Sequence, residues 1–152
     1  QPDAKLFMIF QSNDLLNEIN DMLSCSAALK SAVQLVGKID HSEIANWYSA
    51  ADYFISGSHH EGSGYALIEA LACGLFPVVS SIPPFAKITN SGEVALLFET
   101  GDHEDLFSKL VQLKSMSKPL PDKLISYFQK NLSFKKIADT LYEHCRQLVE
   151  GE

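Results

Sequence analysis

The stretch HHEGSGYALIEALACG, His59 to Gly74, decides the fold and raises the question of function. Glu61 stands in a glycine-containing loop, and Glu69 stands inside the apolar helical run that follows. The start of a helix has free backbone N–H groups and about half a positive charge, so it can hold an anion. A carboxylate on each side of that anion can accept hydrogen bonds from sugar hydroxyls. The alternative is that both carboxylates are solvated surface charges, with Glu69 near a helix start where acidic residues are favoured.

Strand and helix patterns alternate on both sides of this stretch. Short apolar runs predict buried strands, and apolar residues three or four positions apart predict helices. The predicted strands are Lys5–Phe10 (buried on both faces), Val33–Val36, Tyr53–Ser56, Pro77–Ser80 and Val94–Phe98. The predicted helices are Asn13–Lys30, a helix capped by Ser42, one from Gly64 or Tyr65 to a left-handed cap at Gly74, Phe85–Thr89, Asp102–Met116 with Asp102 as cap, Pro121–Asn131 and Ser133–Glu150, with Ile82-Pro83-Pro84 as a rigid loop.

This alternation predicts an α/β fold, a Rossmann-like parallel sheet with helices on both faces. Ligands bind such sheets outside the carboxyl ends of the strands, and the loop after Ser56 lies at such an end. Gly62 and Gly64 allow close backbone approach and unusual φ, which suits a phosphate-binding loop. Because the chain has 152 residues, a length typical of one domain, we expect a single domain over 1–152.

Composition and charge exclude several classes of function. The net charge of −7 and the scattered lysines speak against nucleic-acid binding. No apolar run approaches the roughly 18 residues that span a bilayer, so we expect no transmembrane segment. Three distant cysteines give neither a disulfide framework nor a metal-binding spacing, so we expect a reduced, cytosolic protein without a metal. We expect no signal peptide at the start of the sequence, and because the sequence begins almost directly in a predicted strand, we expect it to be a fragment of a longer protein.

Other candidate side chains flank the stretch. His60 is a candidate ligand contact, and His59 a weaker one, because both stand in the loop before Glu61. Trp47, Tyr48 and Tyr53 are interpreted as packing residues and not as a platform for base stacking.

The run SAADYFISGSHHEGSGYALIEALACGLFPVV, Ser49 to Val79, resembles the donor-binding C-terminal domain of retaining glycosyltransferases of family 4 (group 1), which have the GT-B fold. The similarity extends over nearly the whole chain. The matching residues are Ser58, Glu61-Gly62, Gly64, Glu69-Ala70, Ala72, Gly74 and Pro77-Val78-Val79.

The resemblance implies a role for each site residue. Glu69 would bind the nucleotide ribose, and Glu61 would contact the donor sugar and is the catalytic candidate. The backbone amides of the helix start would hold the diphosphate without a metal or other cofactor. These amides belong to Gly64, Tyr65, Ala66 and Leu67, and the remaining donor-binding candidates are Gly62, Ser63 and His60.

Three departures from the family pattern leave the donor undetermined. Ser63 replaces an aromatic residue, Pro83-Pro84 replaces a Gly-Gly pair, and Lys87 stands where an acidic residue is expected. The family also has an arginine and a lysine that neutralise the diphosphate, and these come from a segment before this chain. The acceptor-binding N-terminal domain precedes that segment.

The resemblance therefore implies a hexosyltransferase that moves a sugar from a nucleoside-diphosphate sugar to a glycan or lipid acceptor. We expect the full-length enzyme to be cytoplasmic, peripheral to the inner face of the membrane, and the isolated domain to be nearly inactive. Two alternatives stay open: a non-catalytic GT-B-like binding module, and a sugar-nucleotide epimerase or phosphorylase of the same fold.

Overall fold

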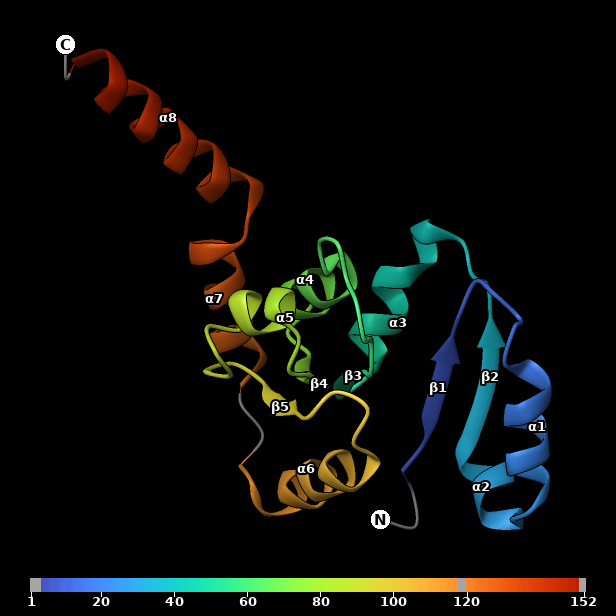
Figure 1. The fold of residues 1–152 in the computed structure, drawn as a ribbon. Coiled ribbons are helices and arrows are strands. Elements are labelled where there is room, and N and C mark those ends of the chain that lie inside the picture. The colour runs from blue at the N-terminus through green and yellow to red at the C-terminus, as the bar shows by residue number, and fades with distance from the viewer. Residues whose placement is uncertain (1–3, 118–119, 151–152) are drawn as a thin grey trace. The chain divides into compact units, whose positions relative to one another are not determined.

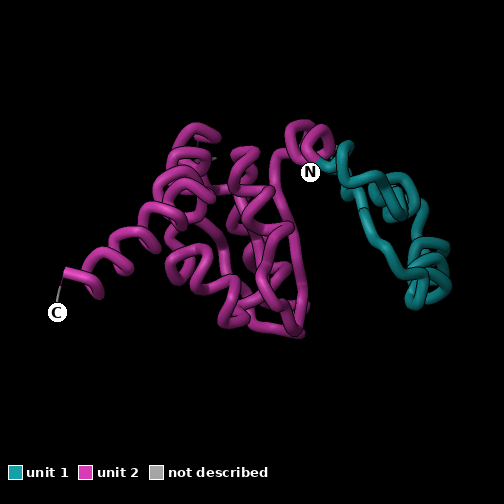
Figure 2. The backbone as a smooth tube through the Cα atoms, turned by 90° about the horizontal axis from the view of Figure 1, so that it is seen from above, with its two compact units in different colours: residues 1–44 teal, residues 45–152 magenta. Residues whose placement is uncertain are grey.

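The computed structural model describes residues 4–117 and 120–150, and the chain divides into two compact units, 1–44 and 45–152 (Figures 1 and 2). Each unit carries parallel strands and helices. The prediction of a single domain over 1–152 stays a prediction. Residues 1–3, where the sequence begins, lie outside the described residues.

The first unit pairs two parallel strands, β1 (Leu6–Ile9) and β2 (Val33–Gly37). Between them lie α1 (Leu16–Ser24) and α2 (Ala27–Ala32). The prediction that the first strand is buried on both faces is wrong, because Leu6, Phe7 and Ile9 are exposed and β1 pairs, among the described residues, with β2 alone.

The predicted single helix over Asn13–Lys30 is also wrong, because the chain breaks between α1 and α2. Ser26 has an extended backbone, with φ −147° and ψ 121°, and its side chain accepts a hydrogen bond from the Leu29 amide. A serine in this conformation caps a new helix instead of continuing the old one.

The prediction that Ser42 caps the next helix is also wrong. Asp40 is the capping residue, and its carboxylate accepts bonds from the Ser42 amide at 2.9 Å and the Ser42 hydroxyl at 2.8 Å. These bonds lower the pKa of Asp40. A short 3₁₀ turn, η1 (His41–Glu43), follows and leads into α3 (Ile44–Ala50).

The second unit contains three parallel strands in the order β3 (Tyr53–Ser56), β4 (Phe76–Ser80), β5 (Leu96–Phe98). Tyr53 lies opposite Phe76, and Val78 lies opposite Leu96. The expected last strand begins later than Val94, since Val94 and Ala95 belong to the preceding turn.

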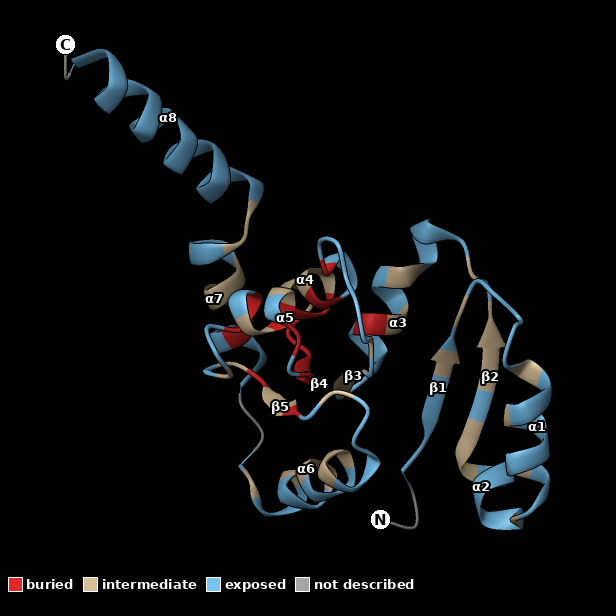
Figure 3. Cartoon of the chain, viewed as in Figure 1, coloured by how far each residue is buried: buried red, intermediate tan, exposed pale blue. Residues whose placement is uncertain are grey.

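Helices cover this sheet. α4 (Tyr65–Ala72) packs on β4, α5 (Pro83–Ile88) and α7 (Pro121–Asn131), and α6 (His103–Ser115) packs on β4 and β5. α4 and α6 lie on opposite sides of the strands (Figure 1). α8 (Phe134–Glu150) is exposed along its length (Figure 3).

Apolar side chains of α4, β4, α5 and α7 form the core of this unit, shown in red in Figure 3. Every residue of β4 is buried, as expected for the middle strand of a sheet covered on both faces. The buried members of the core are Leu67, Leu71, Phe76, Val79, Ile82, Phe85, Ile88 and Leu124.

Pro83 and Pro84 do not form the predicted rigid loop. They occupy the first two positions of α5, where the missing N–H groups leave no intrahelical bond unmade and the fixed φ suits a helix.

The predicted cap at Asp102 is confirmed, because its carboxylate accepts hydrogen bonds from the amides of Glu104 and Asp105 at 2.9 and 3.0 Å.

Gly74 has φ 78°, which confirms the predicted left-handed cap after α4. A Cβ there would lie 2.8 Å from Pro121 Cβ and 3.1 Å from Pro121 Cα.

We expect Gly74→Ala to lower the free energy of unfolding by about 1–3 kcal/mol, through the left-handed backbone and the clash with α7. Urea denaturation measures the change. Gly57→Ala is the control, because its nearest contact is 3.9 Å and its φ is not left-handed; equal losses in both variants would contradict the prediction.

Candidate functional site

The loop of residues 57–64 joins β3 to α4 at the carboxyl edge of the three-stranded sheet. Ser80, the last residue of β4, donates its hydroxyl to the Ser58 carbonyl at 2.5 Å. The His59 ring lies 3.3 Å from the position a Cβ would take on Gly101, in the loop after β5. The loop is therefore bonded to the end of β4 and lies beside the loop after β5, at the sheet edge where the sequence predicts ligand binding.

Glu61 is exposed, and one of its carboxylate oxygens is held by the loop itself. The Ser58 hydroxyl donates to Glu61 Oε1 at 2.8 Å, and Ser58 Oγ and Ser56 Oγ form a hydrogen bond of 3.1 Å. These two hydrogen bonds orient the Glu61 carboxylate through Oε1 and leave Oε2 available. Ser58 belongs to the motif that carries the family resemblance, but nothing in the sequence indicated this bond.

Gly64 is the N-cap of α4 and has a left-handed backbone with φ 63°. A Cβ on it would lie 2.7 Å from Ile88 Cδ1 and 3.3 Å from Phe85 Cε1, so a residue with a side chain does not fit. Gly62 has no left-handed φ, and a Cβ there would meet nothing within 4 Å. The predicted unusual φ is confirmed at Gly64 and wrong at Gly62.

The start of α4 presents backbone amides to the carboxyl edge. No side chain among the described residues caps the helix at Gly64. The amides of Leu67 and Ile68 both donate to the Gly64 carbonyl, at 3.1 and 3.2 Å. Tyr65 and Ala66 precede these first bonds and are exposed, so their amides are the ones best suited to an anion.

The other donor-binding candidates in the loop are solvent-accessible. His60, Gly62 and Ser63 are exposed, and Gly64 is buried. Their roles toward a donor stay predictions, as do those of Tyr65, Ala66 and Leu67. The Leu67 side chain is fully buried in the core.

Glu69 lies in the second turn of α4 and is half-buried. The hydroxyl of Tyr48, on α3, donates to Glu69 Oε2 at 3.5 Å. Burial and the nearby Glu69 charge raise the pKa of Tyr48 to about 12. Burial of the Cys73 thiol and the Glu69 charge raise the pKa of that thiol, which belongs to the residue directly after α4. Glu69 is therefore part of a polar group between α3 and α4, which disfavours the interpretation that it is a solvated surface charge.

Tyr48 is buried, and its ring packs edge-on against Phe54 with 6.1 Å between ring centroids and 71° between ring planes. The prediction that Tyr48 packs is confirmed. Its contact with Glu69 was missed, because the spacing between two helices is set by tertiary packing that the sequence pattern does not reveal.

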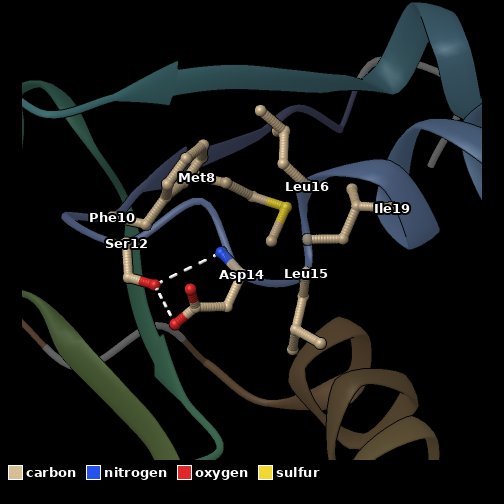
Figure 4. Close-up of a pocket in the computed structure, with 7 residues that line it drawn as sticks. All are labelled: Met8, Phe10, Ser12, Asp14, Leu15, Leu16 and Ile19. Carbon is tan, nitrogen blue, oxygen red and sulfur yellow. Dashed lines mark hydrogen bonds between the residues drawn. The ribbon is translucent and has the colours of Figure 1, made fainter.

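The first unit has its own hollow of about 230 Å³ at the carboxyl end of β1 (Figure 4). The Ser12 hydroxyl donates to the Asp14 carboxylate and accepts from the Asp14 amide at 3.2 Å. The remaining walls are apolar. The lining residues are Met8, Phe10, Ser12, Asp14, Leu15, Leu16 and Ile19. No pattern in the sequence indicated this hollow.

Residues 4–117 and 120–150 contain neither a metal-binding cluster nor a membrane-spanning helix. No group of three or more His, Cys, Asp or Glu side chains there is placed to hold a metal ion. No helix in the same residues combines the length and apolar character needed to cross a membrane.

Comparison with known protein families places this site in a known context. The family model described as glycosyl transferases group 1 matches residues 20–131, which include the whole candidate loop and α4. The chain belongs to the group 1 glycosyl transferases. The family predicted from the glutamate and glycine motif is therefore confirmed at this level.

Two curated relatives of this group 1 glycosyl transferase are named for sugar transfer to a diphosphopolyprenol- or diphosphoundecaprenol-linked sugar. GDP-mannose:cellobiosyl-diphosphopolyprenol alpha-mannosyltransferase of Xanthomonas campestris is 38% identical over 66 residues, which are 43% of this chain and 17% of that protein. UDP-Gal:alpha-D-GlcNAc-diphosphoundecaprenol alpha-1,3-galactosyltransferase of Escherichia coli is 28% identical over 144 residues, 91% of this chain. This chain spans only 36% of the Escherichia coli protein.

Solved structures share the fold. Sucrose-phosphate synthase from Thermosynechococcus elongatus superposes with a TM-score of 0.77 at 24% identity, over 97% of this chain and 39% of that one. A glycosyltransferase from Rickettsia africae ESF-5 gives 0.75 at 21% identity, over 99% and 41%. The fold of this group 1 glycosyl transferase is therefore the Rossmann-like C-terminal half of the GT-B fold, as predicted.

The positive φ of Gly64 leads to a prediction about the loop. We expect Gly64→Ala to lower the free energy of unfolding by about 1–3 kcal/mol, because the new Cβ meets Ile88 and the backbone is strained. Gly62→Ala, two residues away, changes it by less than about 0.5 kcal/mol. Thermal unfolding of the two variants beside the wild type measures the difference. A Gly64→Ala protein as stable as Gly62→Ala would contradict the geometry.

Tyr48 gives a prediction about pH. Its pKa rises from 10.0 to about 12 on folding, so the folded state holds the phenol proton more tightly than the unfolded state. The stabilisation is complete below pH 10 and is lost as the pH rises toward 12, because unfolding then releases a proton into an alkaline solution. Absorbance titration of the phenolates should show a tyrosine ionising near pH 12 that Tyr48→Phe removes, beside Tyr127, whose pKa burial and the Glu93 charge also raise. A variant that loses a tyrosine of ordinary pKa and keeps the step near pH 12 would refute the assignment.

Proposed function

We propose that this chain is the donor-binding domain of a retaining glycosyltransferase that transfers a hexose from a nucleoside-diphosphate sugar to a glycan or lipid acceptor. The observation that carries the proposal is the start of α4, where Gly64 caps the helix without a capping side chain and Glu61 and Glu69 lie on either side. Family membership supports sugar transfer, and the site supports binding of the donor.

The diphosphate lies on the amides of Tyr65 and Ala66. A helix start contributes only about 0.3–1 kcal/mol toward an anion when exposed and up to about 2 kcal/mol when partly buried, so further contacts are needed. His60, Gly62 and Ser63 border the same loop and supply side-chain and backbone contacts to the donor. In this proposal no metal is used, and positive charge comes from an arginine and a lysine elsewhere in the full-length protein.

Glu69 accepts hydrogen bonds from the ribose hydroxyls of the nucleotide. It is half-buried, and its carboxylate lies against a hydroxyl donor, which suits a group that must hold its position for a ligand. Glu61 contacts the transferred sugar. Ser58 donates to one oxygen of Glu61, which leaves the other oxygen to accept from a sugar hydroxyl.

Catalysis requires more than this chain. Bringing donor and acceptor together accounts for about 7–11 kcal/mol of a typical barrier, and the acceptor is bound by the N-terminal domain of the full-length enzyme. We therefore propose that the chain alone binds the donor with little transfer.

The relatives named above are named for GDP-mannose and UDP-Gal as donors and for diphosphopolyprenol- or diphosphoundecaprenol-linked acceptors, which favours GDP or UDP as the nucleotide. It also favours a cytoplasmic enzyme at the inner face of the membrane.

Nucleotide binding by the chain tests this proposal. A thermal-shift screen of GDP, UDP and ADP should show a rise in melting temperature with at least one of them, because a ligand of the native state stabilises it. A chain that binds none of the three would favour a non-catalytic module. Sugar release or epimerisation without an acceptor in the full-length protein would favour a phosphorylase or an epimerase.

Glu69→Ala tests the ribose contact directly. We expect the Kd of the bound nucleotide, measured by calorimetry, to rise about tenfold or more, since a hydrogen bond to a charged group contributes about 1.5–3 kcal/mol. The control is Glu93→Ala, an exposed glutamate in the turn before β5, at the opposite edge of the sheet from the loop. An unchanged Kd in Glu69→Ala would refute the ribose role.

A further inference from the structure

A polar hollow of about 530 Å³ lies in the second unit, away from the candidate site. It is formed by the end of α5, the turn that leads into β5, and the end of α7. This turn precedes a strand, whereas the loop of residues 57–64 follows one, so in a sheet of parallel strands the two lie at opposite edges. The volume is within the range of pockets that bind small molecules, about 300–1,000 Å³.

The turn that forms one wall of the hollow has an unusual backbone. Asn90, Ser91 and Gly92 have φ of 50°, 56° and 92°, in the left-handed region that only glycine adopts freely. The Ser91 amide donates to the Ala86 carbonyl at 2.7 Å, and the Gly92 amide donates to the Thr89 hydroxyl at 3.3 Å. These bonds hold the turn in place. Left-handed residues with side chains cost free energy, and they gather at segments that clamp a ligand.

Hydrogen bonds also fix the polar side chains of the hollow. The Tyr127 hydroxyl donates to the Ile88 carbonyl at 2.8 Å, which ties α7 to α5. The Asn131 amide nitrogen donates to the Tyr127 carbonyl at 2.9 Å, and the Asn90 amide nitrogen donates to Glu93 Oε2 at 2.5 Å. Burial and the Glu93 charge raise the pKa of the Tyr127 hydroxyl, so this hydroxyl stays a neutral donor. The bonds use side-chain donors and leave side-chain oxygens over.

The atoms that are left over select the class of ligand. Within residues 4–117 and 120–150, Asn90 Oδ1, Asn131 Oδ1 and Glu93 Oε1 accept no hydrogen bond. The Lys87 ammonium supplies donors, and its charge balances that of Glu93. A phosphate group would meet the Glu93 carboxylate, and a metal ion would meet the Lys87 ammonium. The ligand that suits this set is neutral and brings several hydroxyl donors.

We propose that this hollow is a saccharide site, separate from the candidate donor site, which binds one or two sugar units of a neutral glycan. The sugar hydroxyls donate to the three unused oxygens, and Lys87 donates to a sugar oxygen. The C–H groups of the sugar ring lie against Tyr127 and Leu132, which supply the apolar part of the lining. The site does not depend on nucleotide binding at α4.

An NMR titration of the ¹⁵N-labelled chain tests the site, with maltose, lactose and mannobiose as probes. We expect at least one probe to shift the amide signals of residues 87–93 and 127–132, with a Kd on the order of millimolar because the contacts are few and exposed. The signals of residues 57–64 should stay where they are. The proposal is wrong if no probe at about 50 mM shifts the signals around the hollow, or if the shifts fall on residues 57–64 instead.

Glu93→Ala removes the charged acceptor of the hollow. We expect the Kd of the bound probe to rise about fivefold or more, because hydrogen bonds to charged groups are the stronger ones. Asn131→Ala should raise it about two- to fivefold through the loss of a neutral acceptor. The matched control is Glu99→Ala, an exposed glutamate in the loop after β5, at the other edge of the sheet. It should leave the Kd within about twofold of the wild type.

The same variants separate this site from the proposed function. A Glu93→Ala chain that loses the probe and keeps its affinity for GDP or UDP supports two independent sites. If Glu93→Ala and Asn131→Ala bind the probe as tightly as the wild type, the hollow is not the site. An equal loss in Glu99→Ala would also overturn the proposal, since it would come from surface charge in general. A chain that binds the probe at the hollow but no nucleotide contradicts the proposed function and leaves the saccharide site standing.

Discussion

The close contact between the Gly64 backbone and the side chains of Ile88 and Phe85 is the constraint on which the candidate site depends. α4 begins where it does because its N-cap, Gly64, has a left-handed backbone and no side chain, and because α5 fills the space that a side chain would take. This contact fixes the first turn of α4. The orientation of the amides of Tyr65 and Ala66 follows from it, and so does the position of Glu69 one turn later.

The loop before that turn is assembled from parts of the chain that are distant in sequence. Ser80 bonds the Ser58 carbonyl from the end of β4, and Gly101, after β5, leaves space for the His59 ring. Ser58 in turn orients Glu61. The two glutamates are therefore supported by different neighbours, Glu61 by hydroxyls of its own loop and Glu69 by a phenol from α3. The surroundings of the two carboxylates therefore differ, although both stand in one continuous stretch of sequence.

The sequence predicted what is encoded locally. The strand Tyr53–Ser56, the helix Pro121–Asn131 and the caps at Gly74 and Asp102 follow from apolar spacing and from residues with a strong positional preference. It failed where two local signals compete, as at Ser26, where apolar spacing continues through a serine that caps a second helix. Bonds between elements, such as that from Tyr48 to Glu69, leave no pattern along the chain and had to come from the structure.

Pro83 and Pro84 illustrate how a departure from a family motif acquires a structural reason. As part of a loop, they would only remove backbone donors and stiffen the chain. At the first two positions of α5 they start the helix whose Phe85 and Ile88 lie against Gly64. Lys87 then falls in the last turn of the same helix, where a positive charge interacts favourably with the helix dipole. Both departures thus support the helix that holds the start of α4, which gives them a structural reason outside the loop of residues 57–64.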